Sequence, residues 1–250
     1  RKYFNMDTSV LKIDKTNVYE KVYGSEYDSK FDKDAEFETI VRKEQFYTKN
    51  KLNEVFDMLN EIDMIKEDPA HLEHLRTVMK MLSNPLSKAI PEMSIRLDKK
   101  ADMNKGVFRI KNGEGGVDIQ VGVSPKKANN QMSAAETYVH ELVHAAMDFA
   151  FDYAKEKISP TINRLIDMHK QAMEVLTWED LMPDAPMNLE IEEQIAKSRL
   201  DYIKNSKNNL KEFLVYAVTN KKVMNKLKGL KVYITKDKPV GFMEKLMYYT

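Results

Sequence analysis

Apolar residues recur along the chain with two different periods, and these periods predict a mixed fold. Between residues 32 and 67 they return every three to four positions, which predicts a helix. Asp68 and Pro69 then open a second helix, as N-cap and first helical residue. This helix is expected to end before Asn84 and Pro85, because a residue that precedes proline disfavours the helical conformation. The first third of the chain is therefore expected to be helical.

The pattern changes near Pro91, where short stretches rich in β-branched residues follow one another. Ser94–Leu97, Val107–Ile110 and Val117–Val123 are predicted to be strands, and the third alternates cleanly between apolar and polar residues. A glycine-rich turn at residues 113–116 separates the second strand from the third. These stretches predict a small sheet of three or more strands.

The best-marked helix follows this sheet. Ser133 and Glu136 have the spacing of a capping box, and the helix is expected to run from there to about Lys157. Further helices are expected over residues 160–179, from Asn188 onward, and over residues 209–220. The predicted fold class is α+β and mostly helical, with the small sheet packed on the helix that Ser133 opens. We expect a helical N-terminal region of unknown role over residues 1–92 and the sheet-containing domain over residues 93–250.

Composition narrows the range of partners. The 40 basic and 39 acidic residues give a net charge of +1, which does not favour nucleic acid as a partner. There is no cysteine, so any metal site must use histidine and carboxylate ligands. No apolar run approaches the roughly 20 residues of a membrane span, and no signal peptide is recognisable. The start at Arg1 and the abrupt end at Thr250 suggest a processed product or a piece of a longer polypeptide, whose compartment is unknown.

The strongest chemical signal is the motif His140-Glu141-Leu142-Val143-His144 within the best-marked helix. Residues i and i+4 lie one turn apart on one helix face, so His140 and His144 can chelate one ion. Glu141 lies beside the first ligand, where a carboxylate can act as general base on a water molecule. This spacing predicts a catalytic Zn²⁺ site, whereas two ordinary histidines on an amphipathic helix are the simpler alternative.

A catalytic zinc site takes a third protein ligand. No third histidine follows His144 at the metzincin spacing, so the ligand must come from elsewhere. Glu212 is the preferred candidate, because it opens the buried part of an apolar helix, where an unpaired carboxylate is costly. The simpler alternative is a solvent-facing acid in the first turn of that helix. The other candidates are weaker: His169 is the best substitute, Asp148 and Asp152 are expected to turn away from the histidine face, and His71 and His74 are expected to be solvated.

The strand, the HExxH helix and the later Glu212-Phe213 pair resemble the gluzincin metallopeptidases. The segment from Glu212 to Asn220 resembles the glutamate helix of anthrax-lethal-factor-like domains and of metallopeptidase domains in large polyvalent proteins of phages and mobile elements. The resemblance covers about residues 93–250 and implies a zincin-like fold, a Zn²⁺ cofactor and a peptide substrate. It also implies a tyrosine that donates to the oxyanion, for which Tyr202 is the first candidate and Tyr216 the second.

On this hypothesis the chain is a zinc metalloendopeptidase in which Glu141 is the general base, and Val117–Val123 is the edge strand that pairs with an extended substrate. One alternative is a retired zincin scaffold that serves as a structural or interaction module in a larger assembly, such as a phage particle. Another is a binder of nucleic acid or acidic surfaces that uses the lysines between Lys221 and Lys238. That lysine run lacks the interleaved aromatic residues of a nucleic-acid groove and is more typical of a solvated face.

Overall fold

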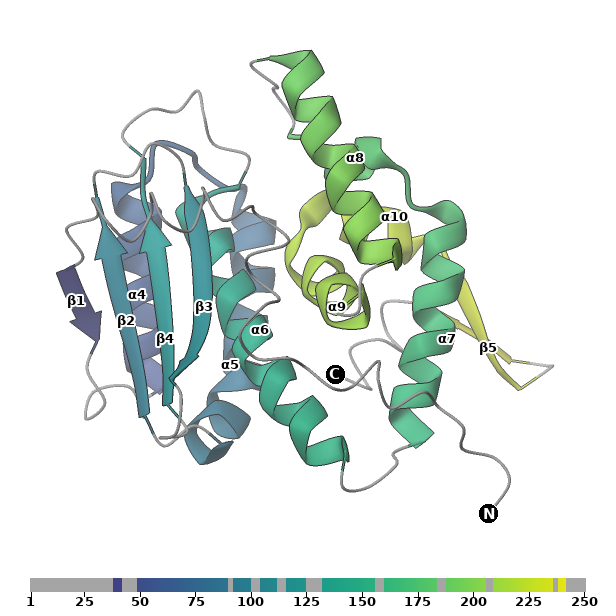
Figure 1. Cartoon of the computed structure of the whole chain (residues 1–250), viewed down its shortest axis with the longest axis horizontal. Coiled ribbons are helices and arrows are strands. Elements are labelled where there is room, and N and C mark those ends of the chain that lie inside the picture. The colour runs from purple at the N-terminus through teal and green to yellow at the C-terminus, as the bar shows by residue number, and fades with distance from the viewer. Residues whose placement is uncertain are drawn as a thin grey trace.

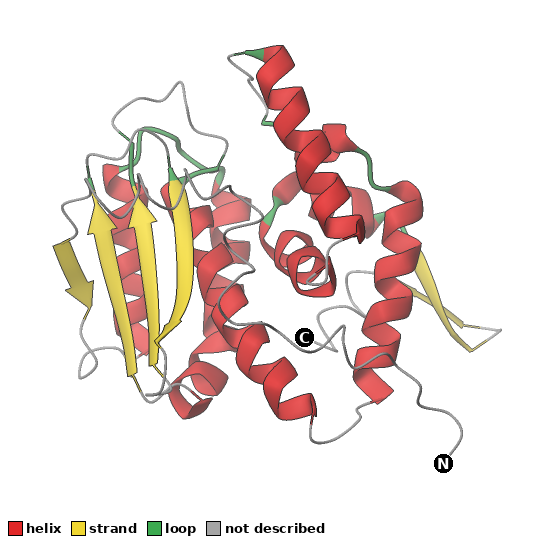
Figure 2. Ribbon diagram, in the orientation of Figure 1, coloured by secondary structure: helices red, strands yellow, loops and turns green. Residues whose placement is uncertain are grey.

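A computed structural model describes the protein over residues 38–41, 49–89, 92–99, 104–111, 116–124, 132–155, 160–183, 188–205, 209–235 and 238–241. The main sheet lies on one side, and most helices and a separate two-stranded hairpin lie on the other (Figure 2). The helices are α4 (Lys49–Ile62), α5 (Pro69–Ala89), α6 (Ala134–Lys155), α7 (Pro160–Val175), α8 (Leu189–Asn205), α9 (Asn209–Thr219) and α10 (Lys221–Lys228), with a 3₁₀ turn at Trp178–Leu181.

The main sheet has the strand order β1-β2-β4-β3. Its strands are β1 (Glu38–Val41), β2 (Glu92–Asp98), β3 (Lys105–Lys111) and β4 (Gly116–Gly122). β2 and β4 run parallel, whereas β1 is antiparallel to β2 and β3 is antiparallel to β4. A separate hairpin joins β5 (Lys231–Thr235) to β6 (Lys238–Gly241).

Helix α6 lies at the centre of the packing. It contacts β3 and β4 on one side, α4 and α5 on another and α9 on a third (Figure 1). Every residue from Ser133 to Val143 is buried, and the apolar ones among them belong to one hydrophobic cluster that runs from Leu52 to Leu227. The N-terminal helices α4 and α5 share this cluster with the sheet. The division at residue 92 stays a prediction, but the described parts on both sides of it share one core.

The predicted fold class needs correction in its sheet. The expectation that a wholly helical region precedes the sheet is wrong, because Glu38–Val41 forms β1 and pairs with β2. Three of these four residues, Thr39, Ile40 and Val41, are β-branched and suit a strand better than a helix. Among the described strands only β2 and β4 form a parallel pair, and β4 lies between β2 and β3 instead of at an edge. What fits is a mostly helical α+β chain with seven α-helices over the described residues.

The second predicted helix also ends later than expected. α5 continues through Pro85 to Ala89, although proline in a helix interior costs about 3 kcal/mol. Leu86, only 1% exposed, lies just beyond the proline in the hydrophobic cluster. Burial of such a side chain returns about 2 kcal/mol, so tertiary packing offsets much of the local cost. The expected N-cap of this helix is confirmed, because the backbone N–H of His71 donates to Asp68 Oδ1 at 3.0 Å.

The start of α6 is fixed by a buried carboxylate at the end of α4. Asp63 is 2% exposed and accepts hydrogen bonds from the backbone N–H of Ala134 and from Asn104 Nδ2, the latter at 2.9 Å. Asn104 also donates to the carbonyl of Met132 at 3.1 Å and accepts from the backbone N–H of Ser124 at 2.8 Å. These bonds tie α4, the start of β3 and the loop before α6 to one point.

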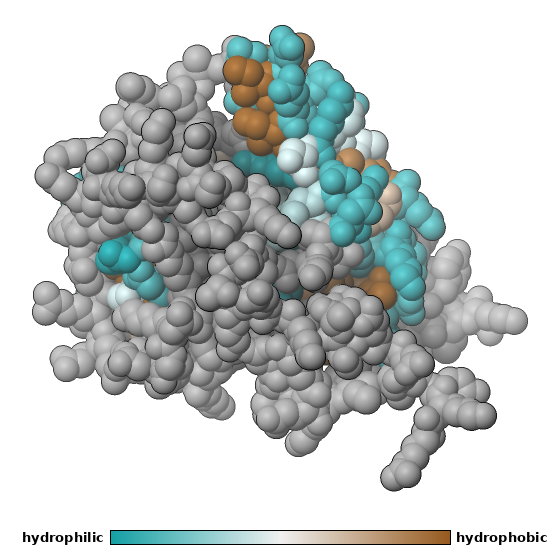
Figure 3. Space-filling view, in the orientation of Figure 1, coloured by the Kyte–Doolittle hydropathy of each residue, from teal (hydrophilic) through white to brown (hydrophobic). Residues whose placement is uncertain are grey.

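None of the described helices is both long and apolar enough to cross a lipid bilayer. Exposed apolar side chains occur at the start of α8, where Leu189 and Ile191 are 63% and 53% exposed. Figure 3 shows hydrophobic surface over this end of α8, bordered by polar atoms.

We expect Asp63→Ala to lower the free energy of unfolding by about 3 kcal/mol, because it leaves buried donors on Asn104 and Ala134 without their acceptor. Asp57→Ala on the same helix is the matched control. Its carboxylate is 47% exposed and pairs with Arg76 at the surface, so the expected loss is below about 1 kcal/mol. Urea denaturation of both variants measures the difference, and equal losses would contradict a special role for Asp63.

Candidate metal centre

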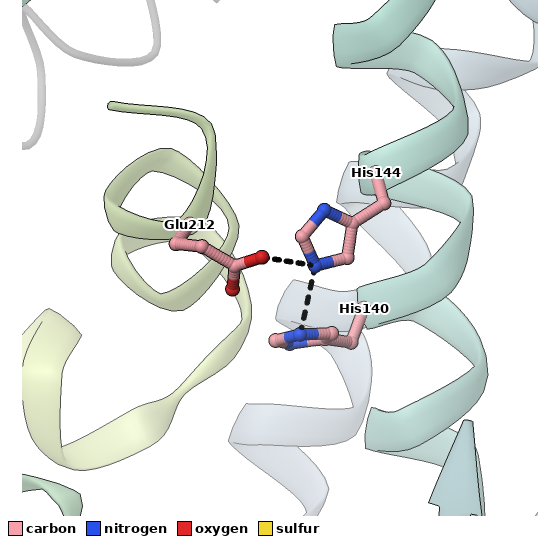
Figure 4. A group of neighbouring side chains, drawn as sticks. All are labelled: His140, His144 and Glu212. Carbon is pink, nitrogen blue, oxygen red and sulfur yellow. Dashed lines mark hydrogen bonds and ion pairs between the residues drawn. The ribbon is translucent and has the colours of Figure 1, made fainter. Parts of the chain in front are cut away.

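The side chains of the three motif residues on helix α6 point in two different directions. Its N-terminus is capped by Ser133, whose Oγ accepts from the backbone N–H of Glu136 at 3.0 Å. His140 and His144 point toward α9 (Figure 4). Glu141, the next residue after His140, lies instead against β3. The helix thus separates the candidate ligands from the candidate base by its own geometry.

The third group comes from α9. Glu212 Oε1 lies 3.6 Å from His144 Nε2, and His144 Nε2 lies 3.2 Å from His140 Nε2. The three side chains converge across the contact between α6 and α9 (Figure 4), and one ligand atom from each lies within 4.8 Å of the others. Residues that are more than 65 positions apart in the sequence are therefore brought to one point, as HExxH and a distant glutamate require.

These separations fit a tetrahedral zinc ion. Two bonds of about 2.0–2.1 Å that meet at the tetrahedral angle place the ligand atoms about 3.3 Å apart. The observed 3.2 Å between the two imidazole nitrogens is close to this value, and the 3.6 Å to the carboxylate is slightly longer. The donor set of two imidazoles and one carboxylate also suits zinc, which three protein ligands hold in catalytic sites.

Both imidazoles are in the state that a metal requires. Burial, followed by the neighbouring His144, holds the pKa of His140 well below its usual value. Burial, followed by the positive charge of Lys211, lowers the pKa of His144 to about 3. Both rings are therefore neutral at pH 7, and each has a nitrogen lone pair that can bind a cation.

Thr219 at the end of α9 orients the ring of His140. Its hydroxyl donates to the carbonyl of Val215 at 2.8 Å, so its oxygen can accept from His140 Nδ1, which lies 3.4 Å away. A proton on Nδ1 leaves the lone pair on Nε2, the atom that faces His144 and Glu212. Such outer contacts fix the tautomer and direction of a ligating histidine.

Glu141 packs against the backbone of β3 at Gly106. A Cβ added to Gly106 would lie 2.4 Å from Glu141 Oε1 and 2.5 Å from its Cγ, so only glycine leaves room for this side chain. Burial, followed by the negative charge of Glu212, raises the pKa of Glu141 to about 8. A carboxyl group with this pKa is largely protonated at pH 7, so it can act as a general base there only where a nearby positive charge lowers its pKa.

The two candidate tyrosines differ in their surroundings. The ring of Tyr216 makes an edge contact with His140, with ring centres 5.0 Å apart, and Tyr216 lies one turn after Glu212 on α9. Burial raises the pKa of Tyr216, so its hydroxyl keeps its proton and can donate. Tyr202 lies half-buried on α8, three residues after Arg199. The positive charge of Arg199 acts on Glu212 and Tyr216, which indicates that this face of α8 lies near the centre.

The other candidate ligands are not part of this cluster. His169 Nε2 faces the carbonyl of Ile203 at 2.9 Å, and its ring packs against Phe213. The expectation that His71 and His74 are solvated is wrong for His71, which is 4% exposed. His74 is partly buried, and its Nε2 lies 2.8 Å from the carbonyl of Val218. Asp148 and Asp152 lie on α6, but their side chains are outside the described set.

The described lysines of the lysine-rich segment form ion pairs or hydrogen bonds within the protein. Lys221 pairs with Asp68 at 2.6 Å, Lys226 with Asp180 at 4.0 Å, and Lys222 donates to the carbonyl of Met182 at 2.8 Å. Each of these three lysines therefore has a partner within the protein.

No protein-family model, no curated protein and no solved structure matches this chain. The site must therefore be judged from its own geometry.

The sequence did not point to three residues around this centre. Gly106 is one of several glycines, and only the strand order places it under Glu141. Thr219 is the last residue of an apolar helix, and nothing in the sequence indicates that its hydroxyl faces a histidine. Arg199 is one basic residue in a highly charged helix, and its approach to Glu212 depends on how α8 packs on α9.

We expect the zinc affinity of this centre to fall as the pH falls below about 7. Burial raises the pKa of Glu212 to about 7, although the positive charges of Arg199 and Lys211 oppose this shift. Below this pH the carboxyl group is protonated, and it must lose its proton before a metal binds. The two histidines have low pKa values and add no competing proton near neutrality.

Competition with a coloured chelator between about pH 5 and pH 8 measures this dependence, with His144→Ala as the blank for zinc bound elsewhere. The expected slope is about tenfold per pH unit below about pH 7, with little change above it. An affinity that stays constant down to pH 5 would contradict the assignment of Glu212 as the third ligand.

Proposed function

We propose that this chain is a zinc-dependent metallopeptidase of the gluzincin type. The observation that carries the proposal is the convergence of His140, His144 and Glu212 on one point, with Glu141 on the adjacent position of the same helix. Bound zinc would polarise a peptide carbonyl and lower the pKa of a water molecule to about 7. The donor set and the measured separations support this cofactor.

In this proposal Glu141 takes the proton from the attacking water and passes it to the leaving amine. The contact of Glu141 with Gly106 supports that role, because it holds the carboxyl group in one place. Tyr216 is the better supported oxyanion donor, since its protonated ring contacts His140. Tyr202 remains a prediction from the family resemblance.

The proposed substrate is an extended peptide that pairs with β3. The expectation that Val117–Val123 is the edge strand that pairs with the substrate is wrong, because β4 is hydrogen-bonded to β2 on one side and to β3 on the other. β3 is the end strand of the described sheet and contacts α6. Its Gly106 touches Glu141, so a peptide added to this edge would run past the candidate base.

The deciding experiment compares the wild type with Glu141→Gln after zinc loading, using unfolded casein and a random peptide mixture as substrates. We expect Glu141→Gln to keep its zinc but to lose at least about 100-fold in kcat/KM, because glutamine cannot accept the proton. Glu190→Gln makes the same change at an exposed position at the start of α8 and should have no effect.

Full activity in Glu141→Gln would contradict the role of this residue. A wild type that binds zinc but cleaves none of these substrates would contradict the peptidase and favour the alternative of a zinc-binding structural module. Zinc content measured in parallel separates this outcome from simple loss of the metal.

A second variant tests how Glu141 is held. Gly106→Ala should lower kcat by about tenfold to 100-fold with zinc content unchanged, because the new methyl group displaces the carboxyl group from its seat. Gly229→Ala is the matched control, since its Cβ would meet nothing nearer than 3.6 Å. A fully active Gly106→Ala enzyme would show that the position of Glu141 over β3 does not matter.

A further inference from the structure

A second group of metal-ligating side chains lies one helical turn before His140, where α5 and α6 begin. His71 Nε2 lies 4.0 Å from Glu67 Oε2 and 4.0 Å from Glu136 Oε2. One ligand atom from each of the three residues lies within 4.8 Å of the others. The proposed peptidase reaction involves none of these side chains. From the sequence, His71 is expected to be solvated.

The histidine in this group lacks a hydrogen bond on the nitrogen that faces the two carboxylates. Among the described residues, no polar atom is within hydrogen-bonding distance of His71 Nε2, although the side chain is only 2% exposed. A buried polar atom in a native protein is normally paired. Burial, followed by the nearby His74, lowers the pKa of His71 to about 4, so the ring is neutral and offers a lone pair.

The two carboxylates also require neutralisation. Glu136 is 5% exposed, and the side chain of Glu67 is 14% exposed. Burial raises the pKa of Glu67, and it raises that of Glu136 further because Glu67 is close by. Glu67 and Glu136 are hydrogen-bonded to one another, so they share a proton unless a cation displaces it, since their like charges repel. One dication balances two carboxylates and a neutral imidazole without residual charge.

Neighbouring side chains hold the group from outside. Asn220 Nδ2 donates to Glu136 Oε1 at 3.4 Å, and Asn220 also caps α10 by accepting from the backbone N–H of Val223 at 3.1 Å. Ser133 Oγ accepts from the backbone N–H of Glu136 at 3.0 Å. The bond from Asn220 is of the kind that orients a carboxylate ligand, whereas the bond to Ser133 fixes the backbone that carries Glu136.

We propose that Glu67, His71 and Glu136 form a second, structural site for a divalent transition-metal ion that joins the start of α5 to the start of α6. One imidazole and two carboxylates suit zinc or manganese better than magnesium or calcium, which prefer oxygen ligands alone. The 4.0 Å separations exceed the tetrahedral value of about 3.3 Å for zinc, so a small inward rotation of the carboxylates accompanies binding. The three side chains are at most 14% exposed, and they leave one position of a four-coordinate ion to a further ligand.

Zinc counting on purified, zinc-loaded protein tests the proposal independently of any peptidase activity. We expect about two zinc ions per chain in the wild type, about one in Glu67→Gln, about one in His144→Ala, and none in the double variant. His74→Ala, a histidine on the same helix outside the group, should keep both. Glu67→Gln preserves the size of the side chain, so the zinc content of this variant tests the second site even if His71→Ala fails to fold.

Thermal unfolding in the His144→Ala background isolates the second site, because the first one is disabled there. Added zinc chloride should raise Tm in this background, whereas the further change Glu136→Gln should abolish the rise. A wild type with one zinc that Glu67→Gln does not remove, or a Tm that zinc leaves unchanged in His144→Ala, would overturn the proposal. One zinc that Glu67→Gln removes and His144→Ala retains would support it and contradict the first centre instead.

Discussion

A single constraint shapes this molecule: a helix buried on three sides carries two glutamates and two histidines in its N-terminal half. Glu136, His140, Glu141 and His144 follow one another along α6, and the first three are at most 7% exposed. Buried ionisable groups need partners or must lose their charge. The surrounding elements supply those partners, with α9 facing the histidines, β3 under Glu141 and α5 beside Glu136. The packing of α6 thus determines the chemistry of both candidate sites.

Local parts of this arrangement could be predicted from the sequence. Two histidines four residues apart share a helix face whatever surrounds them, and the structure has their Nε2 atoms 3.2 Å apart. Glu212 was recognisable because an acid within an apolar helix needs a reason to be buried, and it lies 3.6 Å from His144. Helix caps such as Asp68 depend only on neighbouring residues and were also predictable.

Non-local pairing could not be predicted. The segment Glu38–Val41 lies within a stretch with helical periodicity, and its β-branched residues become recognisable as a strand only through their pairing with β2. The hypothesis of substrate pairing makes Val117–Val123 an edge strand, but β4 lies inside the sheet. Alternation shows that a strand has two different faces and does not show how many neighbours it has. His71 was placed in solvent because its partner Glu136 lies on another helix, 65 residues further along the chain. In each case the deciding contact joins segments that are far apart in the sequence. The period of apolar residues along one segment carries no information about such a contact.

The contact between Gly106 and Glu141 has a consequence for tracing the ancestry of this chain. A residue without a side chain is required at one position of β3 whenever a glutamate follows the first motif histidine in this geometry. Under the proposed peptidase function, diverged relatives that hydrolyse peptides should therefore retain both residues together, whereas relatives without the activity are free to lose them. Joint retention of a strand glycine and the motif glutamate would distinguish working homologues from decayed ones, even where overall sequence similarity has vanished.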